Sequence, residues 1–191
     1  GNIRTLTRNF NSSSNYLYEG NTNQVSGTGL PAMVNLLGVH KTGGKLQLSG
    51  TVRVMNELWL LAGNILSSSE HKLIFSGQSI QSPANQYGEV NMGWEKSFIE
   101  GPLQWEISDA VNLSVPVGKG DVFAPLILQK TEAGFASYQV EYFPRPYANL
   151  VPIARPPLDH ISQLEYWVIA CDPASVNRSA SVGLSWRPAS G

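Results

Sequence analysis

The chain has 191 residues and a formal net charge of −1, with 42% hydrophobic and only 14% charged residues. This length allows one sizeable core or two small ones, and the low charged fraction leaves the solvated surface to Ser, Asn, Thr, Gln and Gly. The sequence has no basic cluster, which argues against nucleic acid or an anionic membrane surface as a partner, because such binding needs several aligned cations. No stretch approaches about eighteen consecutive apolar residues, so we expect no membrane insertion.

The single cysteine and the two ends of the sequence set further expectations. Cys171 has no partner for an intrachain disulfide and follows an apolar run, so we interpret it as a small buried side chain. Residues 1–10 carry two arginines and no apolar core, unlike a signal peptide. Because Gly1 replaces an initiator Met and the last residues are small, we expect a module of a longer protein, with neighbouring domains among its partners.

Residues 1–82 are predicted to form a ladder of short strands. A first strand around 16–18 is followed by a turn at 27–31, and three glycine-closed apolar strands follow at 45–50, 57–63 and 72–77. The closing glycines lie thirteen and fourteen residues apart, and such regular spacing is typical of a β-solenoid. A plain antiparallel meander has the same short strands and turns, so both arrangements stay open.

Residues 98–129 form the central stretch, for which we predict two to four short strands. Breaks are expected at Gly101-Pro102 and at 117–121. Leu113, Val115 and Val117 alternate with Ser114 and Pro116, and a second apolar run follows the glycine turn with Phe123, Leu126 and Leu128. A hairpin of this kind needs further strands and a covering layer to be stable.

The remaining segments complete an all-β prediction. Residues 79–93 are interpreted as a polar crossing, 134–147 as a strand with an aromatic face, and 165–170 and 181–186 as closing strands. A proline-rich connection at 144–158 contains Arg145, Tyr147 and Arg155, which we expect to lie against aromatic rings, and a short helix is considered at 157–164. We therefore predict an all-β fold, with a short β-solenoid or meander over 1–82 and an antiparallel, jelly-roll-like β-sandwich over 83–191.

Several blocks of the sequence also resemble a known group of proteins. They are YLYEGNTNQVSGTGLP at 16–31 with Val34-Asn35-Leu36 after it, then 98–103, 115–120, 140–143, 161–167 and 182–186. In order and spacing, over roughly 16–187, these blocks are similar to modules of large secreted surface proteins of Bacteroidetes. The resemblance implies export through a type IX secretion system and a place on or beyond the outer membrane, in an adhesin-like or polysaccharide-handling protein.

Aromatic side chains are the main candidates for ligand binding. Exposed, coplanar rings bind the C–H faces of sugars, and we name Trp94, Trp105, Tyr138 and Tyr142 as candidates. Trp167 and Trp186, within the closing strands, are expected in the core. Trp59 alternates with Leu58 and Leu60 and is therefore expected on the opposite face of its strand.

Carboxylates could hold a structural calcium ion, although no cofactor is otherwise expected. Asp109 and Asp121, with Asn112, could supply oxygen ligands, but the DxDxDG pattern is absent. Asp159, with His160 and Glu165, is a further candidate, although we prefer to interpret this set as a loop cap with surface pairing.

No enzyme is predicted. A serine hydrolase would need a G-x-S-x-G elbow, which the sequence lacks, and Glu95 with Glu100 or Glu106 has no spacing that brings carboxylates together for glycoside hydrolysis. Our leading expectation is a non-catalytic extracellular module for adhesion, scaffolding or attachment to a surface protein. A carbohydrate-binding module is the alternative, and a hydrolase is a weaker one.

Overall fold

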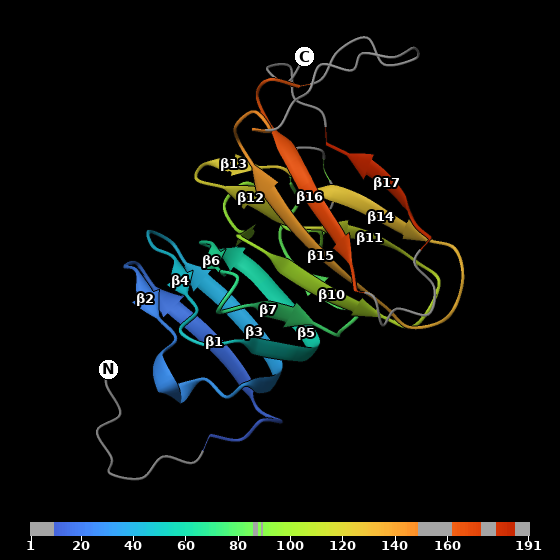
Figure 1. Ribbon diagram of the computed structural model, residues 1–191. Coiled ribbons are helices and arrows are strands. Elements are labelled where there is room, and N and C mark those ends of the chain that lie inside the picture. The colour runs from blue at the N-terminus through green and yellow to red at the C-terminus, as the bar shows by residue number, and fades with distance from the viewer. Residues whose placement is uncertain (1–9, 86–87, 89, 149–161, 173–178, 186–191) are drawn as a thin grey trace, which may run out of the picture.

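The protein is represented by a computed structural model, which describes residues 10–85, 88, 90–148, 162–172 and 179–185. Within these residues the chain forms strands and a single 3-10 turn, η1(Gly27–Gly29), so the all-β prediction is confirmed (Figure 1). Most of the helix considered at 157–164 and much of the proline-rich connection lie outside the described residues.

The largest element is an eight-stranded main sheet. Its strands, in spatial order, are β1(Asn15–Gly20), β3(Met33–Lys41), β5(Val52–Ala62), β7(Leu73–Phe75), β10(Leu103–Ile107), β15(Ala136–Phe143) and β16(Tyr166–Cys171), with β8(Ser79–Gln81) beside β5. Neighbours are parallel from β1 to β10 and antiparallel from β10 to β16. An antiparallel meander would have no parallel neighbours. The parallel pairing from β1 to β10 therefore supports the solenoid over the meander.

A second, side sheet is built from short strands. Its members are β2(Gln24–Val25), β4(Leu46–Gln47), β6(Ile65–Leu66), β9(Ile99–Glu100) and β12(Val117–Lys119), all parallel, with β13(Val122–Phe123) antiparallel at one edge. The chain alternates between the main sheet and the side sheet from β1 to β6. Each coil of the solenoid therefore contributes one long and one short strand (Figure 1).

The coil length differs from the predicted glycine spacing. Leu37 pairs with Leu58, 21 residues later, and Leu46 pairs with Ile65, 19 residues later. The glycine-closed unit 45–50 lies in the side sheet, whereas 57–63 and 72–77 lie in the main sheet. The thirteen- and fourteen-residue spacing was wrong as a repeat length, because glycines close individual strands and a coil needs two strands.

Tyrosines occupy the inward positions of the first coil. Tyr16 and Tyr18 are in register with Leu37 and Val39, and their hydroxyls donate to the Asn11 carbonyl at 2.9 Å and the Ser26 carbonyl at 3.4 Å. Burial, reinforced by the neighbouring Tyr16, raises the pKa of Tyr18 to about 12. A phenol ring covers the apolar interior while its hydroxyl contacts the outer backbone, so this coil acts as a cap for the solenoid.

A three-stranded antiparallel sheet completes the molecule. It contains β11(Val111–Val115), β14(Leu126–Lys130) and β17(Ser181–Leu184). Its buried residues Leu113, Leu126 and Leu128 belong to the same core as Tyr138 and Val140 of β15, so the second half contains two packed layers, as expected of a sandwich. The central stretch 98–129 holds six strands instead of two to four. The break at Gly101-Pro102 is where we predicted it, whereas the break predicted at 117–121 was too wide, because 117–119 form β12 and only Gly120-Asp121 make the turn.

The main sheet and the core both cross the predicted boundary between residues 82 and 83. The parallel pair β7–β10 joins the two segments, and one buried cluster runs from Leu30 to Tyr142.

Trp59 lies opposite to the buried Leu58 and Leu60, as predicted, and its Nε1 donates to the Glu57 carboxylate at 2.7 Å.

Candidate functional site

Three of the four aromatic residues predicted to bind ligand are buried. The exposed fractions are 2% for Trp105, 3% for Tyr138 and 0% for Tyr142, so these rings present no face to a ligand and the prediction was wrong for them. Trp105 lies between the half-buried Gln104 and Glu106 of β10, and Tyr138 and Tyr142 occupy inward positions of β15 on either side of Val140. The alternation of apolar and polar residues along the strands indicated that these rings share one face of the sheet. That face is part of the core because the three-stranded sheet of β11, β14 and β17 packs against it.

Two of these buried rings have polar tips with partners. The Trp105 ring packs against Phe75 at 4.9 Å between centroids, and its Nε1 donates to the Gly77 carbonyl at 3.2 Å. The Tyr142 hydroxyl donates to the Glu165 carboxylate at 2.5 Å. Both arrangements satisfy a buried polar group and are therefore structural.

Trp94 is the predicted candidate that keeps contact with solvent. It is half-buried, its Nε1 donates to the Leu60 carbonyl at 3.1 Å, and the Lys96 ammonium lies 5.6 Å from its ring centroid. With Glu95 and Asp121 it lines a hollow of about 670 Å³, which we call the Trp94 hollow.

Trp167, predicted in the core, is half-buried against the core and donates from Nε1 to the Ala124 carbonyl at 2.9 Å. Trp186, also predicted in the core, lies outside the described residues.

A groove of about 480 Å³, here called the side groove, crosses the outer face of the side sheet. Its lining comes from β4, β6, β9, β12 and β15 and from the loop after β6: Gln47, Leu48, Leu66, Ser67, Ser68, Ser69, His71, Glu100, Gly101, Pro102, Lys119, Glu141 and Phe143. A smaller hollow of about 140 Å³, which reaches β2 at Val25, shares Gln47 and Leu66 with it. The two together follow the solenoid axis across the short strands.

Strand register explains why these residues line the groove. Val25, Gln47, Leu66 and Glu100 are consecutive partners in the side sheet, and the last three point outward because the residue before each of them points into the core. Leu46, Ile65 and Ile99 are those inward residues, all fully buried. In β4, β6 and β9, alternation therefore separates the core from the groove.

Glu100 is held at the centre of the groove by three donors. Lys45 Nζ lies 2.7 Å from its carboxylate and Asn64 Nδ2 lies 3.4 Å away, and the Gly120 amide donates to it as well. Burial alone would raise the pKa of Glu100, but the hydrogen bonds and the Lys45 charge outweigh it and leave the pKa below its ordinary value. Glu100 is therefore ionised and charge-compensated at neutral pH.

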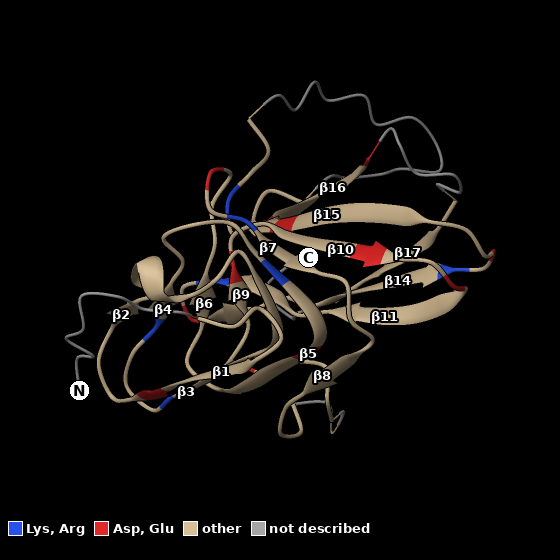
Figure 2. Ribbon diagram, turned by 90° about the horizontal axis from the view of Figure 1, so that it is seen from below, with Lys and Arg blue, Asp and Glu red and all other residues tan. Residues whose placement is uncertain are grey.

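Glu141 has the opposite electrostatic environment. Burial raises the pKa of its carboxyl, and the Lys119 charge offsets only part of that effect. Both side chains line the side groove, so the groove holds two carboxylates and two nearby ammonium groups. In Figure 2 the charged residues of the described chain are scattered along the strands, without a large region of one sign.

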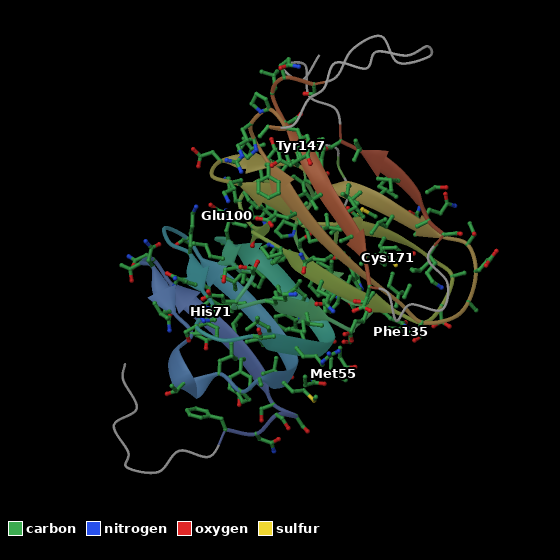
Figure 3. The ribbon with its side chains drawn as sticks, in the orientation of Figure 1. Met55, His71, Glu100, Phe135, Tyr147 and Cys171 are labelled. Atoms are coloured by element: carbon green, nitrogen blue, oxygen red, sulfur yellow. The ribbon has the colours of Figure 1, made fainter. Side chains whose placement is uncertain are left out.

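An aromatic cluster that we did not predict as a site lies at the β15 end of the groove. Phe143 stacks on Tyr166 with centroids 4.8 Å apart and planes 12° apart, and Tyr147 meets Tyr166 edge-on at 5.2 Å. Arg145 lies 5.6 Å from the Phe143 centroid, which confirms the expectation that this arginine lies against an aromatic ring. Tyr147 is 46% exposed, and Figure 3 shows it with Glu100 on the same side of the molecule, whereas Phe135 lies at the other end of β15.

The acidic metal candidates do not converge. Asp109 lies exposed in the turn between β10 and β11, and Asp121 lies in the turn between β12 and β13. Across the described ranges, no three His, Cys, Asp or Glu side chains gather closely enough to hold a metal ion. Asp159 and His160 lie outside the described residues, and Glu165 is buried against Tyr142.

The carboxylates considered for glycoside hydrolysis lie in three different places. Glu95 lines the Trp94 hollow, Glu100 lies in the side groove, and Glu106 forms an ion pair with Arg53 on the main sheet. The nearby Ser76 hydroxyl also donates to Glu106, at 2.8 Å. None of the predicted pairs shares a cavity.

Comparison with protein-family models, with curated proteins and with solved structures gives no match. Among the residues that the structure describes, no helix has the length and apolar character needed to span a membrane.

Proposed function

We propose that the chain is a non-catalytic attachment module of a secreted cell-surface protein and that it binds its partner in the side groove. The observation that carries the proposal is the pair of adjoining hollows over the side sheet, which share Gln47 and Leu66, with Glu100 next in register and Phe143 at one end. The resemblance of blocks such as 16–31 to type IX-secreted surface proteins supports an extracellular location.

A carbohydrate-binding module is the form of attachment that the groove favours. The amide of Gln47 and the hydroxyls of Ser67, Ser68 and Ser69 line it, and an aromatic ring lies at its end, which together match the hydroxyls and the C–H face of a sugar. The groove differs from the surface first predicted, because Trp105, Tyr138 and Tyr142 are in the core.

Retention on defined surfaces tests this function. The purified chain would be applied to cellulose, xylan, starch, polygalacturonate and mucin, with retention measured by sedimentation and released reducing sugar measured in the supernatant. We expect retention on at least one surface without sugar release. Release of sugar, or retention on none of these materials, would overturn the proposal.

A matched pair of substitutions assigns the retention to the groove. Gln47→Trp fills the section shared by the groove and its extension, whereas Gln129→Trp places the same bulk at an exposed position of β14. Loss of retention with Gln47→Trp and full retention with Gln129→Trp is the expected result. Equal retention of both variants would place the binding surface elsewhere.

A further inference from the structure

We propose that the side groove takes an extended, uncharged polysaccharide chain that runs along the solenoid axis, with successive sugars over successive strands of the side sheet. This inference rests on the proposed function, because it names the ligand class of the same groove.

The direction of the ligand follows from how the groove is built. Its floor crosses β4, β6 and β9, which contribute Gln47, Leu66 and Glu100 in register, and it reaches β2 at Val25 and β12 at Lys119. Parallel strands repeat about every 4.8 Å, so these five strands extend over about 19 Å. A linear ligand lying in the groove meets one strand after another, at a spacing close to the length of one pyranose unit.

The backbone of the side sheet argues against an extended peptide as the ligand. Leu46 N donates to the Asn64 carbonyl at 2.9 Å, and Leu48 N donates to the Leu66 carbonyl at 3.0 Å, so these backbone groups are used within the parallel ladder. The groove presents the face of this sheet and not its edge. A peptide that adds as a strand needs a free edge, and a helical peptide needs a mainly apolar groove.

The charges of the groove argue for an uncharged ligand. Lys45 and Glu100 compensate each other at 2.7 Å, and Glu141 lies within the field of Lys119. The lysines that an anionic polymer would need are already paired with carboxylates of the groove. A cationic polymer would have to compete with Lys45 for the Glu100 carboxylate. Hydroxyl groups can donate to these carboxylates and accept from the amide of Gln47 without burying a new charge.

The aromatic end of the groove supplies the apolar contact that a sugar ring requires. Phe143 lines the groove and its ring is held by the stacked Tyr166, while the exposed Tyr147 extends this cluster toward solvent. Rings fixed by their neighbours lose little conformational freedom on binding. We therefore place one sugar of the chain against this cluster and the others over β12, β9, β6 and β4.

A length series of neutral oligosaccharides tests the arrangement. Cello-, xylo- and malto-oligosaccharides of two to six units would be titrated into the protein by calorimetry, with oligogalacturonates of the same lengths as the charged comparison. We expect one neutral series to bind, with affinity that increases up to about four or five units and then stays constant, since the groove crosses five strands. Affinity that is already maximal for a disaccharide would overturn the extended arrangement.

Substitutions of Tyr147, after the end of β15, and of Phe135, just before its start, test the aromatic contact. Tyr147→Ala should weaken binding of the longest neutral oligosaccharide about five- to tenfold, and Phe135→Ala, which removes an exposed ring at the other end of this strand, should leave it unchanged. Equal effects of the two substitutions would contradict the assignment.

The same titrations separate this inference from the proposed function. Binding of the oligogalacturonates alone, abolished by Gln47→Trp, would overturn the neutral ligand and leave attachment through the groove intact. Binding of a neutral series that Gln47→Trp leaves unchanged would overturn both, since the ligand would then lie outside the groove.

Discussion

Tyr142 and Glu165 form a buried contact that ties the segment before β16 to the core. The hydroxyl–carboxylate distance is 2.5 Å, and the exposed fractions are 0% and 3%. Tyr142→Phe keeps the ring and removes this donor, so we expect the free energy of unfolding to fall by about 1–3 kcal/mol. Urea denaturation measures the change. Tyr147→Phe, at an exposed ring, should change stability by less than about 0.5 kcal/mol, and equal effects would show that the hydroxyl of Tyr142 contributes nothing specific.

The two groove carboxylates predict opposite pH dependences of stability. The pKa of Glu100 is lower in the folded protein than its ordinary value of 4.5, so its stabilising contribution is present above that value and is lost as the pH falls through the lowered pKa. Glu100→Gln should therefore destabilise the protein at pH 7, and the difference from the unchanged protein should shrink toward pH 3. Urea midpoints between pH 3 and 7 measure it.

Glu141→Gln provides the comparison of opposite sign. Burial raises the pKa of Glu141, so its carboxylate disfavours the folded state at neutral pH and this cost disappears once both states are protonated. The substitution should stabilise the protein at pH 7 and have little effect at pH 3. Parallel pH profiles for the two variants would contradict both assignments.

At the level of the coil, Gly63 sets the tight connection between β5 and β6. Its φ of +74° favours glycine, and a Cβ there would clash with the Gly44 carbonyl oxygen and lie 2.7 Å from that of Lys41. Gly63→Ala should therefore cost about 3 kcal/mol or more, because both the conformation and the contact are unfavourable.

Gly120 serves as the control for this position. It has a similar φ of +62° in the turn between β12 and β13, but a Cβ there meets nothing within 4 Å. Gly120→Ala should cost only the conformational part, about 1 kcal/mol. Thermal unfolding of both variants measures the difference, and equal costs would mean that adjacent coils are not packed against the Gly63 turn.

An asparagine ladder shows how neighbouring coils also join through side chains. Asn35 Nδ2 donates to Asn15 Oδ1 at 2.6 Å, and Asn56 Nδ2 donates to Asn35 Oδ1. These residues lie on β1, β3 and β5, so one residue of each coil takes part. The ladder lies at the surface, where it adds modestly to the backbone pairing of the parallel strands.

Across the whole molecule, the shared main sheet predicts a single cooperative unfolding transition. The pairing of β7 with β10 and the continuous core join residues 1–82 to residues 83–191. Separating the segments would expose Leu73, Phe75 and Trp105, which are at most 2% exposed. Calorimetry should give equal calorimetric and van't Hoff enthalpies. Two resolved transitions would instead support the division into two independent units that the sequence suggested.

Strand positions and their inward faces followed from local chemistry. Alternation of apolar and polar residues placed Leu58 opposite Trp59, and glycine or proline marked the breaks at Gly101-Pro102, because these effects act over a few residues. Pairing between strands acts over longer separations. Nothing local distinguished a parallel partner 21 residues away from an antiparallel neighbour, so the glycine spacing gave the wrong coil length.

The candidate site depended on tertiary structure for the same reason. Gln47, Glu100 and Phe143 line one groove although they are far apart in the sequence, and no short motif joins them. Tyr138 and Tyr142 have the residue types of a sugar-binding surface, but the three-stranded sheet covers them and turns that surface into core. Sequence thus determined the all-β class and most strand positions, whereas burial and the groove were decided by which sheets meet, a property of long-range packing.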